Sequence, residues 1–237
     1  MRRLLIAKAG STLASLRARR GDYEDWILSG LGLPRERAAV VRVFADEDLP
    51  ARDALAGVVV TGSSAMVSAR EPWSERSALW LREVVAAGTP VLGICYGHQL
   101  LAHALGGRVG PNPRGREIGT IELWLEPAAR ADPLLGALPG RCRVQATHVE
   151  SVLELPPGAR ALASSEGDPA QAFAAGDAAW GVQFHPEFDA DVMRSYLEER
   201  RALLAGEGLD AAGLLRRVEE TPHGTRLLRR FAELLRF

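Results

Sequence analysis

Short apolar runs that alternate with amphipathic stretches are the feature that most limits what this chain can fold into. Residues 57–61 read Gly-Val-Val-Val-Thr, which is typical of a strand covered on both faces. Residues 73–87 carry apolar side chains at helical spacing and end at Gly88, and a second apolar run, 90–94, follows at once. Strand, helix and strand in this order predict a parallel sheet with helices on both faces.

Two further strands are predicted at residues 4–7 and 40–44, and the whole pattern predicts the α/β class. Between residues 118 and 182 the strand-like pieces are shorter and are joined by Pro/Gly turns, which indicates an antiparallel or mixed part of the same sheet. From residue 191 onward the pattern is helical. We therefore expect a domain with a central, mostly parallel sheet flanked by helices over residues 1–190. We expect a helical C-terminal extension over residues 191–237 to pack on the same domain.

The charge balance and the hydropathy pattern exclude several classes of partner. The chain has 237 residues, and 29 Lys and Arg against 30 Asp and Glu give a formal net charge of -1. No overall basic field therefore attracts nucleic acid or an anionic membrane. No apolar run approaches the roughly 18 residues needed to cross a bilayer. The apolar N-terminal stretch is interrupted by Lys8, which favours a buried first strand over a signal peptide. We expect a cytoplasmic protein with no nucleic-acid or membrane partner.

The sequence contains no sign of a metal or a bound cofactor. Its two cysteines, Cys95 and Cys142, cannot build a disulfide framework, and neither belongs to a CxxC or Cys/His metal spacing. Neither GxxxxGK[ST] nor a GxGxxG that follows a strand is present. We therefore expect no metal and no cofactor.

The segment around Cys95 carries the first chemical signal. A buried strand runs straight into Cys95 and a helix begins directly after it, which places this side chain at the carboxyl end of the sheet, where open α/β sheets bind ligands. Gly93 and Gly97 leave room for a sharp turn, and the helix N-terminus favours a thiolate. A small, unreactive core cysteine is the alternative interpretation of this segment taken alone.

A second strand end supplies a base and a carboxylate. Residues 180–184 form an apolar run that leads into His185, and Glu187 follows two residues later. A cysteine nucleophile needs a general base, and that base needs a third group to fix its tautomer and orientation. We therefore predict Cys95 as the nucleophile, His185 as the base and Glu187 as the orienting carboxylate. A lone histidine at a strand end would instead be a hydrogen-bonded structural residue.

These two motifs carry a family resemblance. Residues 93–99 (Gly-Ile-Cys-Tyr-Gly-His-Gln) and 183–187 (Gln-Phe-His-Pro-Glu) resemble the class I (triad) glutamine amidotransferases, in particular the amidotransferase domain of GMP synthase and its stand-alone relatives. The resemblance extends from about residue 40 to about residue 190, and more weakly to both ends. It implies a flavodoxin-like central sheet, and a reaction in which Cys95 attacks the side-chain amide of glutamine. A γ-glutamyl thioester then forms, and ammonia and glutamate are released.

The resemblance also implies a site for the developing oxyanion. The family has an oxyanion loop after its third strand, and residues 61–65 hold that place here, without the family's usual Gly-Pro. The backbone N–H groups of Ser63 and Tyr96 are the expected donors. Without the two flanking motifs, an ordinary strand-to-loop turn would be the favoured interpretation of this segment.

Further residues are expected to contact the substrate. They are Gly62 of the oxyanion loop, Gln99 one helical turn past the nucleophile, and the Thr-His segment with its next residue, Thr147, His148 and Val149. The family often has Gly-Asp after that histidine, where this chain has Val149 and Glu150. Such a change narrows or reshapes the pocket, so the substrate stays open between glutamine and another γ-glutamyl compound.

Three functions remain open at this stage. The leading hypothesis is a glutamine amidotransferase that releases ammonia for a partner, because the chain lacks the phosphate-binding loop of an ATP pyrophosphatase domain and its acceptor chemistry would need a separate synthetase subunit. The second is a stand-alone γ-glutamyl peptidase or hydrolase that uses the same triad. The third, a binding or regulatory module, is disfavoured because a site that has lost its catalytic activity has no need of Cys95, His185 and Glu187 together.

Overall fold

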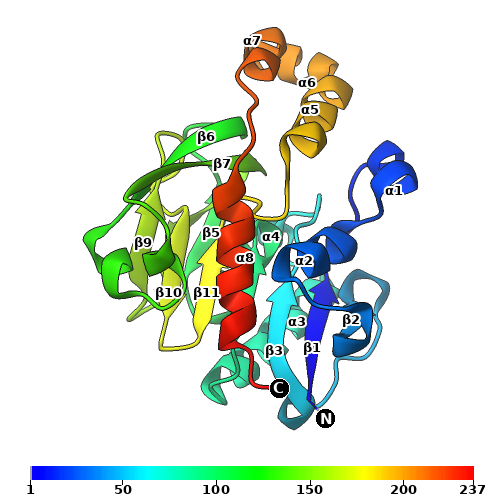
Figure 1. Cartoon of the computed structure of the whole chain (residues 1–237), viewed down its shortest axis with the longest axis vertical. Coiled ribbons are helices and arrows are strands. Elements are labelled where there is room, and N and C mark those ends of the chain that lie inside the picture. Colours follow the sequence, from blue (N-terminus) through cyan, green and yellow to red (C-terminus); the bar gives the residue numbers. More distant parts are fainter. Residues whose placement is uncertain (1) are drawn as a thin grey trace.

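A nine-stranded mixed sheet forms the centre of the protein in the computed structural model, which describes residues 2–237 (Figure 1). Its strand order is β2-β1-β3-β4-β11-β10-β9-β6-β7, and β5 pairs with β8 in a separate two-stranded sheet. Strands β2, β1, β3, β4 and β11 run parallel to one another. Strands β10, β9, β6 and β7 extend the sheet in antiparallel pairings. The parallel half has the 2-1-3-4-5 order of flavodoxin-like sheets.

The strands are β1 (Arg3–Lys8), β2 (Ala38–Arg42), β3 (Leu55–Val60), β4 (Val91–Ile94), β5 (Arg108–Pro111), β6 (Glu117–Leu125), β7 (Arg141–His148), β8 (Glu150–Glu154), β9 (Arg160–Ser164), β10 (Ala172–Ala175) and β11 (Ala179–Val182). The α-helices are α1 (Ala14–Arg20), α2 (Tyr23–Leu31), α3 (Pro72–Ala86), α4 (Tyr96–Ala104), α5 (Ala190–Glu199), α6 (Arg201–Gly206), α7 (Ala211–Arg216) and α8 (Pro222–Leu234).

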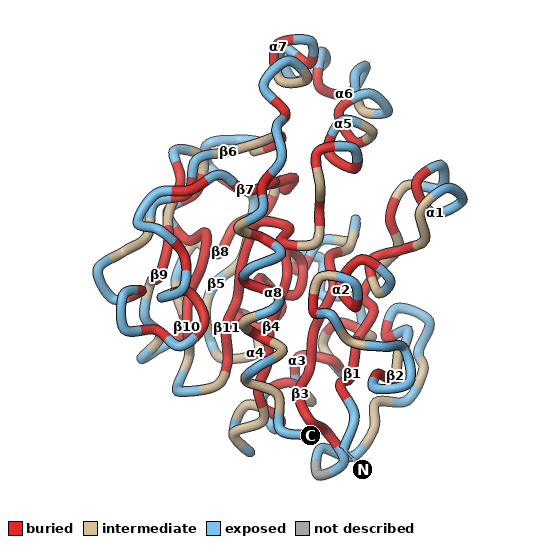
Figure 2. The backbone as a smooth tube through the Cα atoms, in the orientation of Figure 1, coloured by how far each residue is buried: buried red, intermediate tan, exposed pale blue. Residues whose placement is uncertain are grey.

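Two apolar layers explain why the parallel strands are apolar on both faces. In β1, Leu4 and Ile6 belong to a core shared with helices α2 and α8, whereas Leu5 and Ala7 belong to a second core shared with α3 and α4. Successive side chains of a strand point to opposite faces, so a strand between two helical layers needs apolar residues at every position. Figure 2 shows β1, β3 and β4 buried along most of their length.

The fold confirms the predicted α/β class with a central, partly parallel sheet flanked by helices. Helix α2 begins directly after Asp22, and Asp22 and Asp25 form a capping box at its N-terminus. The strand predicted at residues 40–44 is β2, which ends at Arg42, earlier than expected. The N–H of Arg42 donates to the Glu47 carboxylate at 2.7 Å, and the chain turns into a 3-10 helix over Val43–Ala45.

The C-terminal helices form two structural parts. Helices α5, α6 and α7 make an arm that extends beyond the sheet, and α8 returns to lie against it (Figure 1). Helix α8 packs on α2, and its Leu227, Leu228 and Phe231 are buried in the core. The expected helix from residue 191 to 204 is divided at Arg200 into α5 and α6. The division of the chain into a domain over residues 1–190 and an extension after it stays a prediction.

None of the helices described within residues 2–237 is both long and apolar enough to span a bilayer.

Candidate active site

The turn between β4 and α4 holds Cys95 in a backbone conformation that residues with a side chain rarely adopt. Its φ is 52° and its ψ is -102°, which lies outside the regions favoured by L-residues. Two glycines make this turn sterically possible. A Cβ on Gly93 would collide with the carbonyl of Gly97, and a Cβ on Gly97 would collide with the carbonyl of Val60. The Cys95 N–H is fixed by a 2.9 Å hydrogen bond to the Val182 carbonyl, which ties the turn to β11.

His185 follows the end of β11 and is held from several sides. Its Nδ1 lies 2.8 Å from Oε1 of Glu187, and its backbone N–H donates to the Gln145 carbonyl at 2.8 Å. The ring of Phe188 stacks on the imidazole with centroids 4.0 Å apart. Burial lowers the pKa of His185, but the negative charges of Glu187 and of the Cys95 thiolate outweigh it and raise the pKa to about 10. An imidazolium in this place can hold a thiolate and later donate a proton.

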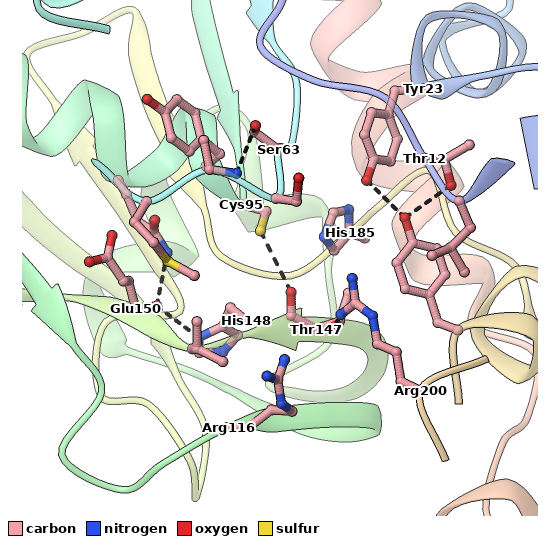
Figure 3. A pocket seen from close by; sticks show the side chains of 18 of the residues that line it. Thr12, Tyr23, Ser63, Cys95, Arg116, Thr147, His148, Glu150, His185 and Arg200 are labelled. Carbon is pink, nitrogen blue, oxygen red and sulfur yellow. Dashed lines mark hydrogen bonds between the residues drawn. The ribbon is translucent and has the colours of Figure 1, made fainter. Parts of the chain in front are cut away.

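One cavity of about 360 Å³ brings most of the predicted site residues together (Figure 3). Eight of them line it: Ser63, Cys95, Tyr96, Gln99, Thr147, His148, Val149 and His185. The residue Cys95 is 6% exposed, and its Sγ lies 3.7 Å from the Thr147 carbonyl oxygen. The cavity therefore reaches a cysteine that is buried in other directions.

The other two predicted residues lie outside the cavity lining. Gly62 packs against the catalytic pair, because a Cβ at this position would lie 3.0 Å from Cε1 of His185 and 3.8 Å from Cβ of Cys95. The Glu187 side chain is fully buried and contacts His185. Both positions suit support of the histidine rather than contact with a ligand.

The loop after β3 places Ser63 at the cavity beside Tyr96. Tyr96 is the first residue of α4, so its N–H has no acceptor within the helix. Gly10, at the end of β1, lets that chain approach the loop, because a Cβ there would lie 2.7 Å from the Ser63 hydroxyl. The Ser63 hydroxyl accepts a 3.1 Å hydrogen bond from the Ala65 N–H and so braces the loop.

Gln99 and His148 belong to a buried polar scaffold beneath the cavity. The Gln99 amide donates to the Glu150 carbonyl at 2.8 Å and to the Gln183 side chain at 3.0 Å. His148 contacts the same Glu150 carbonyl through Nδ1 at 3.0 Å and Oε2 of Glu117 through Nε2 at 2.8 Å. Both protons of the Gln99 amide are used in this scaffold, so its carbonyl oxygen is the group that remains for a ligand.

One wall of the cavity is formed by residues that were not predicted from the sequence. Tyr196, Arg200 and Leu203 reach it from the C-terminal arm, and Thr12 and Tyr23 reach it from the start of the chain. The Tyr196 hydroxyl lies 2.8 Å from the Tyr23 hydroxyl and 2.9 Å from that of Thr12. No local motif marks these residues. They also share no single pattern, since Thr12 precedes α1 and Leu203 is an exposed apolar residue, and they come together only through the fold.

Cys142 shows how different a structural cysteine is. It lies on β7 away from the cavity, and burial raises the pKa of its thiol to about 11. Both cysteines are free. In the described part of the chain, no three His, Cys, Asp or Glu side chains are grouped closely enough to hold a metal ion.

The sheet and the cavity at its carboxyl edge define an α/β protein with an enzyme-type site centred on a cysteine. Residues 23–203 match the family model "Glutamine amidotransferase class-I". The chain belongs to the class I glutamine amidotransferase family and is an enzyme of that class. The match includes the segment of strongest resemblance, residues 40–190, and extends beyond it at both ends to include part of the arm.

Individual relatives agree with this family. The chain is 41% identical over 132 residues to the glutamine-hydrolyzing GMP synthase of Aeropyrum pernix, covering 56% of this chain and 24% of that protein. It is 42% identical over 106 residues to a subunit of the glutamine-hydrolyzing GMP synthase of Haloarcula marismortui, covering 44% of this chain and 54% of that subunit. A crystal structure of a glutamine amidotransferase from Thermotoga maritima has the same fold, with a TM-score of 0.77 and 24% identity over 98% of this chain and 97% of that one. The chain spans about a quarter of the length of the GMP synthases that it matches.

Proposed function

We propose that this protein hydrolyses the side-chain amide of glutamine through Cys95, His185 and Glu187, with a γ-glutamyl thioester as the intermediate. One observation carries the assignment. The ends of β4 and β11, adjacent strands of the sheet, bring a strained cysteine and a histidine of raised pKa into one cavity, with a buried carboxylate behind the histidine. These are the groups that acyl transfer to a thiol requires.

In the proposed first half-reaction, the Cys95 thiolate attacks the γ-carbonyl carbon and the carbonyl π electrons move to oxygen. When the tetrahedral intermediate collapses, the C–N bond breaks and the leaving nitrogen takes a proton from the His185 imidazolium. In the second half-reaction, water gives a proton to His185 and adds to the thioester. The C–S bond then breaks, which releases glutamate and restores the thiolate. Glu187 keeps the proton on Nδ1 of His185 and stabilises its positive charge throughout.

The remaining predicted residues are assigned to binding. We assign the oxyanion to the N–H groups of Ser63 and Tyr96, because both residues line the cavity beside Cys95. The residues proposed to contact the substrate directly are Gln99, Thr147, His148 and Val149. Gly62 differs from the others because it acts through close packing on His185 rather than by lining the cavity.

The fate of the ammonia is the less direct part of the proposal. The relative from Haloarcula marismortui is named as one subunit of a GMP synthase, which implies a separate synthetase chain in that protein. We propose a synthetase subunit as the acceptor of ammonia here as well. Binding of a purified candidate synthetase and ammonia-dependent product formation test that step apart from hydrolysis. A cytoplasmic location stays a prediction from the composition.

Glutamate and ammonia released from glutamine by the purified protein test the proposed hydrolysis. The wild-type protein is expected to release both products in equal amounts, and Cys95→Ala and His185→Ala are expected to release neither above background. Cys142→Ala is the matched control, since it removes the other buried cysteine, and it is expected to keep wild-type turnover. If a folded Cys95→Ala protein released glutamate and ammonia at the wild-type rate, Cys95 would not be the nucleophile.

A γ-glutamyl hydrolase that uses the same three residues is the second candidate, and one observation favours it. The guanidinium of Arg200 lies at the cavity on the same side of Cys95 as His185, the residue proposed to protonate the leaving nitrogen (Figure 3).

A further inference from the structure

Arg200 is a cation at the edge of the cavity that forms no direct ion pair, although the charge of Glu207 acts on it from beyond contact distance. Its Nη1 donates to the Thr147 hydroxyl at 3.0 Å, and its guanidinium lies over the Tyr196 ring, 4.8 Å from the centroid. Among the described residues, no Asp or Glu oxygen lies within 4.0 Å of it. A half-buried arginine that stacks on an aromatic ring keeps most of its five donors available for a planar anion.

The second arginine of the cavity provides the contrast. Arg116 forms a bidentate ion pair with Glu207, with its Nε 2.7 Å and its Nη2 2.9 Å from the two carboxylate oxygens. Its side chain is 12% exposed. Glu207 is therefore in direct contact with Arg116, whereas it acts on Arg200 only through its charge at longer range. An anion entering the cavity would find its partner at Arg200.

The position of Arg200 tells which part of a substrate it meets. In Figure 3, Arg200 lies on the same side of Cys95 as His185, and Glu150 lies on the opposite side. A glutamyl group bound to Gln99 and His148, as proposed above, occupies the Glu150 side. The leaving nitrogen must face His185, because that imidazolium supplies its proton. Arg200 therefore meets the leaving group, and Thr147 links the two halves: its carbonyl contacts Cys95 Sγ and its hydroxyl contacts Arg200.

We propose that the site accepts γ-glutamyl compounds whose leaving amine carries a carboxylate, such as γ-glutamyl amino acids, and that Arg200 binds that carboxylate. This inference rests on the proposed Cys95 mechanism and adds a substrate class to it. The chemistry is the same two half-reactions, with the C–N bond to an amino acid broken in place of the bond to ammonia. The proton that His185 donates goes to the amino acid nitrogen.

The charge of the leaving group is what distinguishes this substrate from glutamine. Ammonia leaves as a small molecule that takes up a proton in water, and a free cation beside its exit does not favour it. A carboxylated amine instead forms a charge-assisted, bidentate pair with a guanidinium. Such a contact also holds the leaving nitrogen near His185, which aids proton transfer.

The test compares two substrates that differ in one charge, γ-glutamyl-alanine and γ-glutamyl-alanine amide, in wild type and Arg200→Gln. Wild type is expected to prefer the acid. In Arg200→Gln the ratio of kcat/KM for the acid to that for the amide is expected to fall about 10- to 100-fold, as for loss of a hydrogen bond to a charged group. Arg200→Lys keeps the charge without the planar fork, so it should retain part of the preference. Arg201→Gln is the matched control, because Arg201 is the next residue, is exposed and does not line the cavity.

Three outcomes overturn the inference. An unchanged ratio in a folded Arg200→Gln protein would mean that Arg200 only anchors the arm or binds the glutamyl half, since both roles affect the two substrates equally. An equal loss of ratio in Arg201→Gln would mean a general effect of surface charge. Hydrolysis of glutamine with no hydrolysis of either dipeptide would refute the new substrate class and leave the proposed function standing. Activity on all three compounds that survives Cys95→Ala would instead refute the proposed function itself.

Discussion

Nδ1 of His185 lies 2.8 Å from Oε1 of Glu187, and the carboxylate of Glu187 is shielded from solvent. A hydrogen bond from Nδ1–H to this carboxylate leaves Nε2 to exchange a proton with Cys95 and the substrate. Water does not compete for the carboxylate, so the pair has one geometry. Glu187 is thus placed to set both the tautomer and the charge of the histidine.

Glu187→Gln should therefore slow hydrolysis without removing the nucleophile. The amide keeps the shape of the side chain but loses the negative charge that stabilises the imidazolium. We expect kcat to fall by about 10- to 100-fold, less than for His185→Ala, which removes the proton carrier itself. Steady-state kinetics of both variants measure the order, and alkylation of Cys95 should persist at a lower rate in Glu187→Gln. Full activity of His185→Ala would refute the mechanism, whereas full activity of Glu187→Gln would remove only the third member.

The raised pKa of His185 predicts how stability depends on pH. Burial alone would lower this pKa, but Glu187 and the Cys95 thiolate raise it to about 10 in the folded protein, against an ordinary value of about 6.5. A proton bound more tightly in the folded state stabilises it. This contribution is complete below the unfolded pKa and is lost as the pH rises through the folded pKa. Urea unfolding at several pH values should show a steeper loss of stability between about pH 7 and pH 10 in wild type than in His185→Gln. Parallel curves for the two proteins would contradict the pairing.

The two cysteines should differ sharply toward electrophiles. Burial raises the pKa of the Cys142 thiol to about 11, so it stays protonated at neutral pH. Cys95 lies at the cavity and at the start of α4, beside His185. A glutamine-like chloroketone should therefore label Cys95, and peptide mass spectrometry locates the tag. Labelling mainly at Cys142 would mean that the nucleophile has been assigned to the wrong residue.

Gly62 offers a test of how closely the loop after β3 fits the catalytic pair. A methyl group at this position would lie 3.0 Å from Cε1 of His185, so Gly62→Ala must displace the imidazole by a few tenths of an ångström. We expect kcat to fall about tenfold or more with the fold retained, because small misplacements of reacting groups are costly. Gly140→Ala is the control, since nothing lies within 4 Å of its Cβ position. Equal kinetics of the two variants would show that Gly62 has no part in positioning His185.

Local signals in the sequence were sufficient for the parallel half of the sheet and for the strand ends that carry Cys95 and His185. Strands β3 and β4 are continuous apolar runs, and the strand-to-helix turn at Cys95 is marked by Gly93 and Gly97. Short strands such as β5 and β8 were not predicted. They are four and five residues long and pair only with each other, so each depends on a partner distant in the sequence.

The wall of the cavity formed by the arm was beyond local prediction for a similar reason. Arg200 belongs to a charged helical stretch, where exposure to solvent is the ordinary expectation. Its place beside Thr147 arises only when the arm folds over the end of β7, and no periodicity in the arm encodes that contact. In the same way, the support that Gly62 gives His185 depends on packing between two loops.

Direct trapping of the acyl-enzyme tests the central claim most directly. The protein is mixed with glutamine, quenched with acid within the first turnovers and digested, and the peptide that contains Cys95 is examined by mass spectrometry. We predict that this peptide gains the mass of one glutamyl group, that the adduct is lost on treatment with hydroxylamine, as expected of a thioester, and that Cys95→Ala forms none. A glutamyl adduct on another residue, or release of glutamate by Cys95→Ala at the wild-type rate, would contradict the account.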